Sequence, residues 1–360
     1  MGVRIGVPRE IKNGERRVVL TPSAVAMAVA RGGDVLVETT AGDGAGFDDG
    51  QYHAAGAKIV DSAEEVWACD VVVKVKEPQE SEYDWFRDDL TLFAYLHLAA
   101  EPDLTAALVD RGVSAYGFET LVGRGGGLPL LAPMSEIAGR AAAILGASRL
   151  STAGGGNGTL IGGAAGVLPG RVVVLGLGVA GTAAARGLRG LDGLVTGVDV
   201  DLSRLFEHRL AGTVDATCVS EPELVGQLVA DADLVVGAAL VPGARAPIVV
   251  TEEHVAAMRP GSVIVDLAID QGGCIETARP TSLSDPVYEA HGVVHYCVTN
   301  VPGQFPRTAS AALSAAVAPR LLALTDVVAA GHSGQTEPPA LAGALNVAAG
   351  AITHPALISS

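Results

Sequence analysis

The chain has 360 residues, 49% of them hydrophobic and 18% charged, so it can bury a sizeable core and is not a disordered polyelectrolyte. Its 40 acidic and 24 basic residues give a formal net charge of −16. A surface this acidic repels phosphate backbones and anionic lipid, which argues against nucleic-acid and membrane-surface binding. Because one domain usually has roughly 100–200 residues, the length predicts two domains.

Cysteine usage and the absence of long apolar runs indicate the compartment. The four cysteines are far apart and form no C-x-x-C pair: Cys69, Cys218, Cys274 and Cys297. This pattern predicts buried reduced thiols, with neither disulfides nor a metal site. Residues 1–6 contain no apolar segment of signal-peptide length, and the most apolar stretch, 234–244, is about half a membrane span. We therefore expect a cytoplasmic protein that does not cross a membrane.

The first 120 or so residues alternate short apolar strands with helices, which predicts an α/β sheet. Two of the strands, 71–75 and 92–96, are continuously apolar and are typical of buried parallel strands. The remaining elements of this part are strands at 3–7 and 34–38 and helices at 22–31 and 102–111.

A second unit follows an Ala-rich helix, 134–150, that we expect to begin at Ser135 as a cap and to connect two lobes. The expected strands are 172–175, 193–199, 234–239, 262–267 and 293–298, with helices at 179–188 and 307–324 and a partly helical tail at 338–360. If the last part folds back on the first lobe, the domains are 1–128 with 307–360, and 129–306.

A glycine fingerprint gives the strongest local signal. Residues 176–181 read Gly-Leu-Gly-Val-Ala-Gly, directly after a strand and at the start of a helix. In a dinucleotide-binding turn the first glycine (Gly176) makes the tight bend, the second (Gly178) lets the diphosphate approach, and the third (Gly181) lets helix and strand pack closely. N–H groups of the helix start, including Val179 and Ala180, would face the diphosphate.

An acid at the end of the next strand strengthens this interpretation. Asp199 is placed to accept hydrogen bonds from the ribose hydroxyls of NAD and to repel the 2′-phosphate of NADP. The alternative is a tight strand–helix turn without a ligand. We therefore predict that 129–306 is a Rossmann domain that binds NAD.

Two lysines and a histidine follow predicted strands of the first lobe. Lys74 and Lys76 end one strand, two residues apart and hence expected on the same side, and His97 ends the next. Ligands bind at the carboxyl ends of strands in open α/β sheets, so cations and an imidazole there could clamp a carboxylate and exchange a proton. Arg17 belongs to the same lobe. The alternative is that the lysines are solvated and His97 is an ordinary buried histidine.

Two polar residues end strands of the second lobe. Asp270 leaves an apolar strand into a Gly-Gly loop, and Asn300 ends the following strand before a proline. Both could face a substrate or the nicotinamide. The alternatives are a loop acid or helix cap for Asp270 and a turn former for Asn300.

With these residues in view, the chain resembles the alanine dehydrogenases, a family that also includes the NAD-binding subunit of proton-translocating transhydrogenase. The resemblance runs from about residue 3 to 325 and weakly to 357. Its carriers are Pro-Arg-Glu-Ile-Lys at 8–12, Arg-Val at 17–18, Gly-Ala-Gly-Phe at 44–47, Ala-Gly-Ala at 55–57, Lys-Val-Lys-Glu-Pro at 74–78, Leu-His-Leu-Ala at 96–99, Ala-Pro-Met-Ser-Glu at 132–136, the glycine fingerprint, Val-Pro-Gly-Ala at 241–244, Asp-Leu-Ala-Ile-Asp-Gln-Gly-Gly at 266–273 and Asn-Val-Pro-Gly at 300–303.

The resemblance implies roles for the substrate and proton residues. Arg17 and Lys76 would hold the substrate carboxylate and carbonyl, with Asn300 also near the substrate. His97 would act as acid and base, and Asp270 would orient or activate the water that attacks the iminium. The reaction implied is reversible oxidative deamination of L-alanine to pyruvate and ammonia, with hydride transfer to NAD.

The resemblance likewise implies roles for the cofactor residues. The fingerprint glycines and Asp199 would hold NAD, Met134 and Ser135 would approach its nicotinamide side, and Ser220 would approach the adenine ribose. Ile269 would also belong to the cofactor-binding residues. It also implies a Rossmann domain beside a second, flavodoxin-like α/β substrate domain, a cleft that closes between two lobes, and a hexamer.

Departures from the family pattern keep alternatives open. Val301 stands where the family usually has methionine, and Gln304-Phe305 replaces a smaller pair. These changes favour, as a second hypothesis, an NAD-dependent dehydrogenase or imine reductase acting on another amino acid or 2-oxo acid. A third hypothesis, of a different class, is a non-catalytic NAD-binding subunit. Retention of Lys76, His97 and Asp270 together favours a dehydrogenase over transhydrogenase.

Overall fold

The computed structural model describes residues 2–240, 245–331 and 338–358, and separates them into two compact units. Unit 1 combines Met1–Met134 with Gly303–Ser360, and unit 2 is Ser135–Pro302. The predicted boundaries, 128/129 and 306/307, lie a few residues from these divisions. The motif at 241–244 lies outside the described residues.

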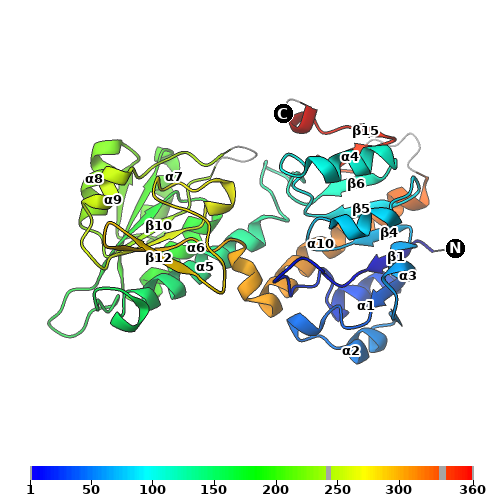
Figure 1. Cartoon of the computed structure of the whole chain (residues 1–360), viewed down its shortest axis with the longest axis horizontal. Coiled ribbons are helices and arrows are strands. Elements are labelled where there is room, and N and C mark those ends of the chain that lie inside the picture. Colours follow the sequence, from blue (N-terminus) through cyan, green and yellow to red (C-terminus); the bar gives the residue numbers. More distant parts are fainter. Residues whose placement is uncertain (1, 241–244, 332–337, 359–360) are drawn as a thin grey trace. The chain divides into compact units, whose positions relative to one another are not determined.

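Unit 1 contains an eight-stranded sheet in the order β15-β14-β6-β5-β4-β1-β2-β3, parallel except for its last hairpin (Figure 1). Without the edge strand β3 and that hairpin, the chain-order pattern is 2-1-3-4-5, which is flavodoxin-like. The strands are β1 Arg4–Val7, β2 Asp34–Glu38, β3 Lys58–Val60, β4 Val71–Val73, β5 Thr91–Ala94, β6 Ser114–Gly117, β14 Leu345–Ala348 and β15 Ala351–Ile352. The helices are α1 Pro22–Ala30, α2 Asp49–Ala54, α3 Ala63–Trp67, α4 Pro102–Asp110, α10 Pro306–Ala329 and α11 Pro355–Ile358.

Unit 2 contains a seven-stranded sheet in the order β12-β13-β11-β10-β7-β8-β9. Apart from the antiparallel edge strand β12, its strands follow the Rossmann order 3-2-1-4-5-6. The strands are β7 Arg171–Leu175, β8 Leu194–Asp199, β9 Ala216–Val219, β10 Leu234–Gly237, β11 Val263–Asp266, β12 Val287–Ala290 and β13 Val293–Tyr296. The helices are α5 Ala132–Arg149, α6 Val179–Gly190, α7 Leu202–Leu210, α8 Pro222–Ala230 and α9 Glu252–Ala256. The predicted α/β class with a Rossmann unit is confirmed.

The central strands are valine-rich because both of their faces are covered. Every residue of β4, β5, β10 and β11 is buried, as expected for parallel strands between two helical layers. Helices begin where the sequence allows it: proline occupies the first turn of α1, α4, α8 and α10, where its missing N–H costs nothing.

One local prediction was wrong, and the tail that was predicted to be partly helical also contains two strands. Helix α5 begins at Ala132, so Ser135 lies inside its first turn and is not its cap. The Ala-rich tail contains the hairpin β14–β15 as well as the short helix α11, and β14 pairs with β6. Positive φ angles at Gly343 and Gly350 break the helical path there, and helix propensity of the alanines does not reveal this.

Helix α10 is apolar because it packs inside unit 1. An 18-residue window of it has mean hydropathy 1.5, enough by length and composition to cross a membrane. Its buried positions, which include Leu313, Val317 and Leu321, recur at helical spacing, and α10 contacts α1. A core helix of a globular unit has this same pattern, so α10 is weak evidence for a membrane span.

Glycine lets α5 approach α6 within unit 2, and this predicts a stability effect. A Cβ at Gly139 would lie 2.0 Å from the carbonyl oxygen of Ala180, whereas a Cβ at Gly190 would meet nothing within 4 Å. We expect Gly139→Ala to lower the free energy of unfolding by about 1–3 kcal/mol through overpacking. The matched control Gly190→Ala should be neutral or stabilising by about 0.5–1 kcal/mol. Urea titrations of both variants measure this, and equal stability would contradict the close approach.

Candidate active site

In unit 1 the predicted site residues follow adjacent strands at one edge of the sheet. Arg17 lies in the segment after β1, Lys76 after β4 and His97 after β5, and these three strands are neighbours. The strand order reverses at β1, which has β2 on one side and β4 on the other. A crevice at the carboxyl ends of such strands is the usual ligand site of open α/β sheets.

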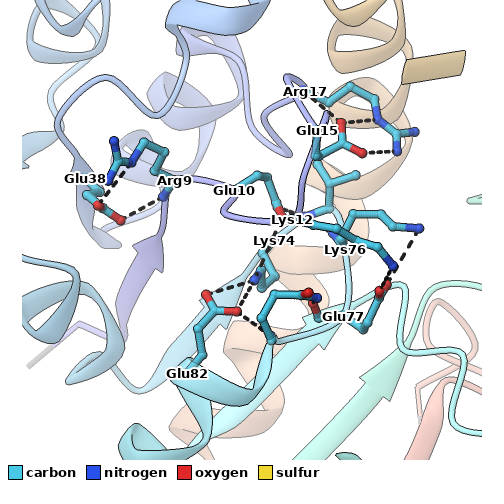
Figure 2. Close-up of polar contacts among 12 residues, drawn as sticks. Arg9, Glu10, Lys12, Glu15, Arg17, Glu38, Lys74, Lys76, Glu77 and Glu82 are labelled. Atoms are coloured by element: carbon cyan, nitrogen blue, oxygen red, sulfur yellow. Dashed lines mark hydrogen bonds and ion pairs between the residues drawn. The ribbon is translucent and has the colours of Figure 1, made fainter. Parts of the chain in front are cut away.

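Arg17 is buried and is held by Glu15, a residue that sequence reasoning missed. Its Nε and Nη2 donate to the two carboxylate oxygens of Glu15 at 2.7 and 2.5 Å, and only 3% of the Arg17 side chain is exposed. Figure 2 shows the guanidinium and the carboxylate facing one another. Burial by itself lowers the pKa of Arg17, but the Glu15 carboxylate outweighs it and raises that pKa, so the arginine stays charged. Nη1 lies 3.3 Å from Sδ of Met134.

The two lysines after β4 differ, contrary to the expectation that they act together. The strand ends at Val73, and Lys74 turns into the interior, where its side chain is fully buried and Nζ donates to both Glu82 oxygens at 2.7 and 2.9 Å. Lys74 is therefore an internal counter-ion. Lys76 remains 15% exposed and is the lysine that can reach a ligand.

Lys76 shares a buried carboxylate with Lys12. Nζ of Lys76 lies 3.6 Å from Glu77, which also forms an ion pair with Lys12, and both lysines point at this carboxylate in Figure 2. Burial alone would raise the pKa of Glu77, but Lys76 and Lys12 lower it below the usual value. Glu77 is thus a fixed negative charge beside Lys76.

His97 is exposed and is aimed by a strained turn. Its φ is +50°, a left-handed conformation that non-glycine residues rarely adopt. The carboxylate of Glu119, after β6, accepts N–H bonds from His97 at 2.7 Å and from Leu96 at 3.2 Å. The ring stacks on Tyr95 with centroids 6.1 Å apart, and Tyr95 also interacts electrostatically with Arg17. His97 is therefore not a buried histidine, and the tyrosine links it to Arg17.

In unit 2 each fingerprint glycine meets a different steric demand. Gly176 has φ +88°, and a Cβ there would lie 2.8 Å from the Ala238 carbonyl oxygen. A Cβ at Gly181 would lie 1.8 Å from the Gly176 carbonyl oxygen, so this glycine is needed for helix–strand packing. A Cβ at Gly178 would meet nothing within 4 Å, which leaves open space in front of the N-terminus of α6. That combination fits a diphosphate-binding turn.

Asp199 ends β8 and is tied to the glycine turn. Its Oδ2 accepts from the Leu177 N–H at 2.7 Å, and Arg204 Nη1 lies 3.1 Å away. Burial raises the pKa of Asp199, but N–H bonds from Asp201 and Leu177 and the Arg204 guanidinium bring it below the usual value. Ser220 donates its N–H to the Asp199 carbonyl oxygen at 3.1 Å, which places it beside this acid. Arg204 is a further polar residue that the motif search did not find.

The other predicted residues of unit 2 gather after β11 and β13. Asp270 lies in the short 3-10 helix Ile269–Gln271, exposed, and accepts a long 3.4 Å bond from the Asn300 N–H. Ile269 is buried in the same turn. The buried carboxylate of Asp266 accepts from the N–H groups of Ala268 and Cys274 at 2.9 Å and so fixes the loop that carries Asp270. Val179 and Ala180 open α6, and Ser135 lies in the first turn of α5.

Glu10 is a buried acid beside the end of β4, and the sequence does not reveal that its ionisation is perturbed. One oxygen accepts the Val75 N–H at 2.5 Å, and the other lies 3.8 Å from Lys74 Nζ. Burial raises its pKa from 4.5 to about 7, against the opposing effects of Lys74 and the Val75 N–H. Because the folded pKa exceeds the unfolded one, ionisation costs stability progressively as pH rises from the unfolded to the folded value.

We therefore expect Glu10→Gln to gain stability relative to the wild type as pH rises. The glutamine keeps an acceptor for the Val75 N–H but cannot ionise. The difference in unfolding free energy should grow by roughly 3 kcal/mol between about pH 4.5 and pH 8, a span that covers the whole shift. Urea unfolding at several pH values tests this, because all other titrating groups are shared. Parallel pH profiles for the two proteins would contradict it.

Comparisons with known proteins agree with this geometry. Two family models match: alanine dehydrogenase/PNT, N-terminal domain, on residues 6–138, and alanine dehydrogenase/PNT, C-terminal domain, on residues 142–355. The chain is 48% identical to an alanine dehydrogenase of Bacillus subtilis (strain 168) over 355 residues, which are 98% of this chain and 93% of that protein. It is 47% identical to an alanine dehydrogenase of Halomonas elongata, with 90% of this chain and 88% of that protein covered.

Solved structures give the same answer. A structure of L-alanine dehydrogenase superposes with a TM-score of 0.94 at 47% identity, covering 99% of this chain and 98% of the other. A transhydrogenase from Sinorhizobium meliloti gives a TM-score of 0.83 at 27% identity, covering 98% and 99%. The resemblance predicted from sequence motifs is confirmed, and the chain belongs to the alanine dehydrogenase/PNT family.

Proposed function

We propose that this chain is an NAD-dependent L-alanine dehydrogenase that interconverts L-alanine with pyruvate and ammonia. The observation that carries the proposal is a buried, charge-paired arginine, Arg17, that shares one sheet edge with a partly exposed lysine, Lys76, and an exposed imidazole, His97. A small 2-oxo acid offers the matching groups, one carboxylate and one carbonyl. The high identity to alanine dehydrogenases over nearly the whole chain supports the same substrate.

The three candidate site residues of unit 1 have distinct roles in this proposal. Arg17 binds the substrate carboxylate, because a guanidinium held in one orientation can form two parallel bonds to it. Lys76 donates to the carbonyl oxygen and stabilises the negative charge that develops there. His97 exchanges a proton with the same oxygen as general acid and base, a task suited to an imidazole near neutral pH.

In unit 2, Asp270 holds and orients the water or ammonia that adds to the imine or carbonyl carbon, and Asn300 contributes a hydrogen bond to substrate. The fingerprint glycines, Val179 and Ala180 bind the diphosphate, while Asp199 and Ser220 bind the adenine ribose. Met134, Ser135 and Ile269 line the nicotinamide. When bound, NAD supplies the acceptor for the hydride that leaves the substrate carbon.

We further propose that the cofactor is NAD and not NADP, that the protein is cytoplasmic, and that it assembles as a homo-hexamer. The ionised Asp199 carboxylate supports the first point, because it accepts from ribose hydroxyls and repels a 2′-phosphate. The acidic composition and the family resemblance support the other two. Sedimentation analysis of the purified chain measures the assembly directly.

The proposal predicts turnover of L-alanine with NAD. Hydride loss requires an uncharged amine, so oxidation should accelerate from about pH 7 to about pH 10. Production of NADH is followed by its near-ultraviolet absorbance. Absence of any rise over this range would remove the proposal.

His97→Ala should reduce turnover by about 100-fold or more, the usual contribution of a general acid or base, while NADH binding stays near that of the wild type. The matched control is His291→Ala, which removes an exposed histidine of unit 2. This variant should keep full activity. Near-normal turnover of the His97 variant would contradict the acid–base role.

Asp199→Ala should weaken NAD binding by about tenfold or more, equivalent to about 1.4 kcal/mol, and relax the preference over NADP. The reason is that the carboxylate is lost while Arg204 remains to face a 2′-phosphate. Kd values for NADH and NADPH, measured by quenching of cofactor fluorescence, test this. An unchanged ratio of the two Kd values would exclude Asp199 as the selecting group.

A second candidate function is the same chemistry on another amino acid or imine. Val301, Gln304 and Phe305 favour it, because they closely follow Asn300 in the sequence and depart from the family pattern. A panel of 2-oxo acids with NADH and either ammonia or alkylamines separates the two. Preference for pyruvate with ammonia by more than about tenfold in kcat/KM would exclude this candidate.

A further inference from the structure

The segment that carries Arg17 also carries Glu15, the residue that holds the Arg17 side chain in place. Gly14 has φ +78°, and the Glu15 N–H bonds back to the Lys12 carbonyl oxygen at 3.0 Å, so the chain reverses just before Glu15. The Glu15 side chain then folds over its own backbone: one oxygen accepts the N–H groups of Arg16 at 3.1 Å and Arg17 at 2.9 Å. These main-chain bonds fix the position of the Glu15 carboxylate independently of its ion pair with the Arg17 guanidinium.

The same carboxylate meets Arg17 in a planar, two-bond geometry. Oε1 accepts from Nε at 2.7 Å and Oε2 from Nη2 at 2.5 Å (Figure 2). This pairing occupies the Nε–Nη2 edge and sets both the position and the plane of the guanidinium. The remaining edge of the guanidinium is Nη1–Nη2, whose Nη1 lies 3.3 Å from Sδ of Met134. A substrate carboxylate that forms two parallel bonds to Arg17 would have to use this edge in place of the weak sulfur acceptor.

Burial makes this arrangement sensitive to the loss of either partner. Only 3% of the Arg17 side chain and 1% of the Glu15 side chain are exposed. A guanidinium without its counter-ion at such a place is strongly disfavoured, and its side chain would turn toward solvent or toward another acid. Glu15 therefore keeps Arg17 buried and oriented.

We propose that Glu15 is a positioning residue for substrate binding, which acts by presenting the Nη1–Nη2 edge of Arg17 to the carboxylate of a 2-oxo acid. This inference rests on the proposed function and deepens it, because it assigns the orientation of the substrate carboxylate to a residue outside the predicted set. Glu15 acts through Arg17 and takes no proton from substrate.

The test uses Glu15→Gln and Glu15→Asp in the full-length chain. The glutamine keeps one acceptor but turns a donor toward Nη2, and the aspartate keeps the charge one methylene further from the guanidinium. We expect Glu15→Gln to raise the KM for pyruvate by about tenfold or more with kcat changed less than about threefold, because binding is what a misplaced arginine loses. Glu15→Asp should lie between it and the wild type.

A binding measurement removes dependence on turnover. Pyruvate is titrated calorimetrically into the enzyme–NAD complex, in which no hydride is available. Its Kd should rise in Glu15→Gln by the same factor as KM, while the Kd of NADH alone stays unchanged. Arg17→Met should itself weaken pyruvate binding. Adding Glu15→Gln to this variant should raise the Kd for pyruvate no further, because Glu15 acts through Arg17.

The matched control is Glu38→Gln. Glu38 also has a buried carboxylate, 7% exposed, that pairs with an arginine of unit 1, Arg9, and accepts its N–H at 2.9 Å. This variant should lose thermal stability without a change in pyruvate KM. If Glu15→Gln behaves in the same way, with lower stability but unchanged KM and Kd for pyruvate, Glu15 is only structural and the inference is overturned.

Failure of the proposed function has a different signature. A wild-type protein that turns over no alanine but binds pyruvate, with a Kd that rises in Glu15→Gln, would refute the dehydrogenase and support the positioning role. A wild-type enzyme that is active, and whose pyruvate Kd is the same as that of Glu15→Gln, would support the dehydrogenase and refute the role of Glu15.

Discussion

In each unit, the reversal of strand order beside one strand, β1 or β7, is the constraint on which the candidate ligand-binding residues depend. Connections from a strand at this point lead to opposite faces of the sheet, so the carboxyl ends of two neighbouring strands are left with room for a ligand. In unit 1 the segments after β1 and β4 carry Arg17 and Lys76. In unit 2 the segment after β7 is the glycine turn, and its first glycine approaches the chain leaving β10. Topology thus sets where a ligand can bind, and the side chains at these strand ends determine which ligand it is.

Buried charge decides which cations of unit 1 can serve a substrate. Lys74 is fully buried and forms an internal ion pair with Glu82. Lys76 is partly exposed, and it shares the carboxylate of Glu77 with Lys12. Arg17 is as buried as an interior ion pair but lies in the segment that follows β1, at the carboxyl edge of the sheet. Pairs of this kind add little net stability, since desolvation offsets their attraction, and their value lies in fixed orientation.

Much of this could be predicted because it is encoded locally. The alternation of apolar strands and helices gave both sheets, and the glycine motif with Asp199 gave the turn that the structure contains. Partners from distant positions carry no such local signal: nothing in the spacing of Glu119 points to the backbone of His97. The strands β3, β6, β9 and β12 were missed because they are short and less apolar. The strand β14 and its hairpin partner β15 were missed because the pairing of β14 with β6 depends on tertiary contact. The two lysines after β4 were misjudged because strand alternation stops at Val73.

Asp199 joins cofactor choice to the integrity of the glycine turn. Its Oδ2 holds the N–H of Leu177, the residue between the first two fingerprint glycines, while the same carboxylate is the group proposed to face the ribose. Asp199→Ala, which removes the negative charge that repels a 2′-phosphate, also removes the acceptor of the Leu177 N–H in the glycine turn. NAD binding then loses both the ribose contact and the support of the diphosphate-binding turn. Arg204 cannot compensate for the second loss, because it is a donor. The preference for NAD that we propose is thus coupled to the fold of the turn. Asp199→Ala therefore weakens NAD binding at the same time as it relaxes the preference over NADP.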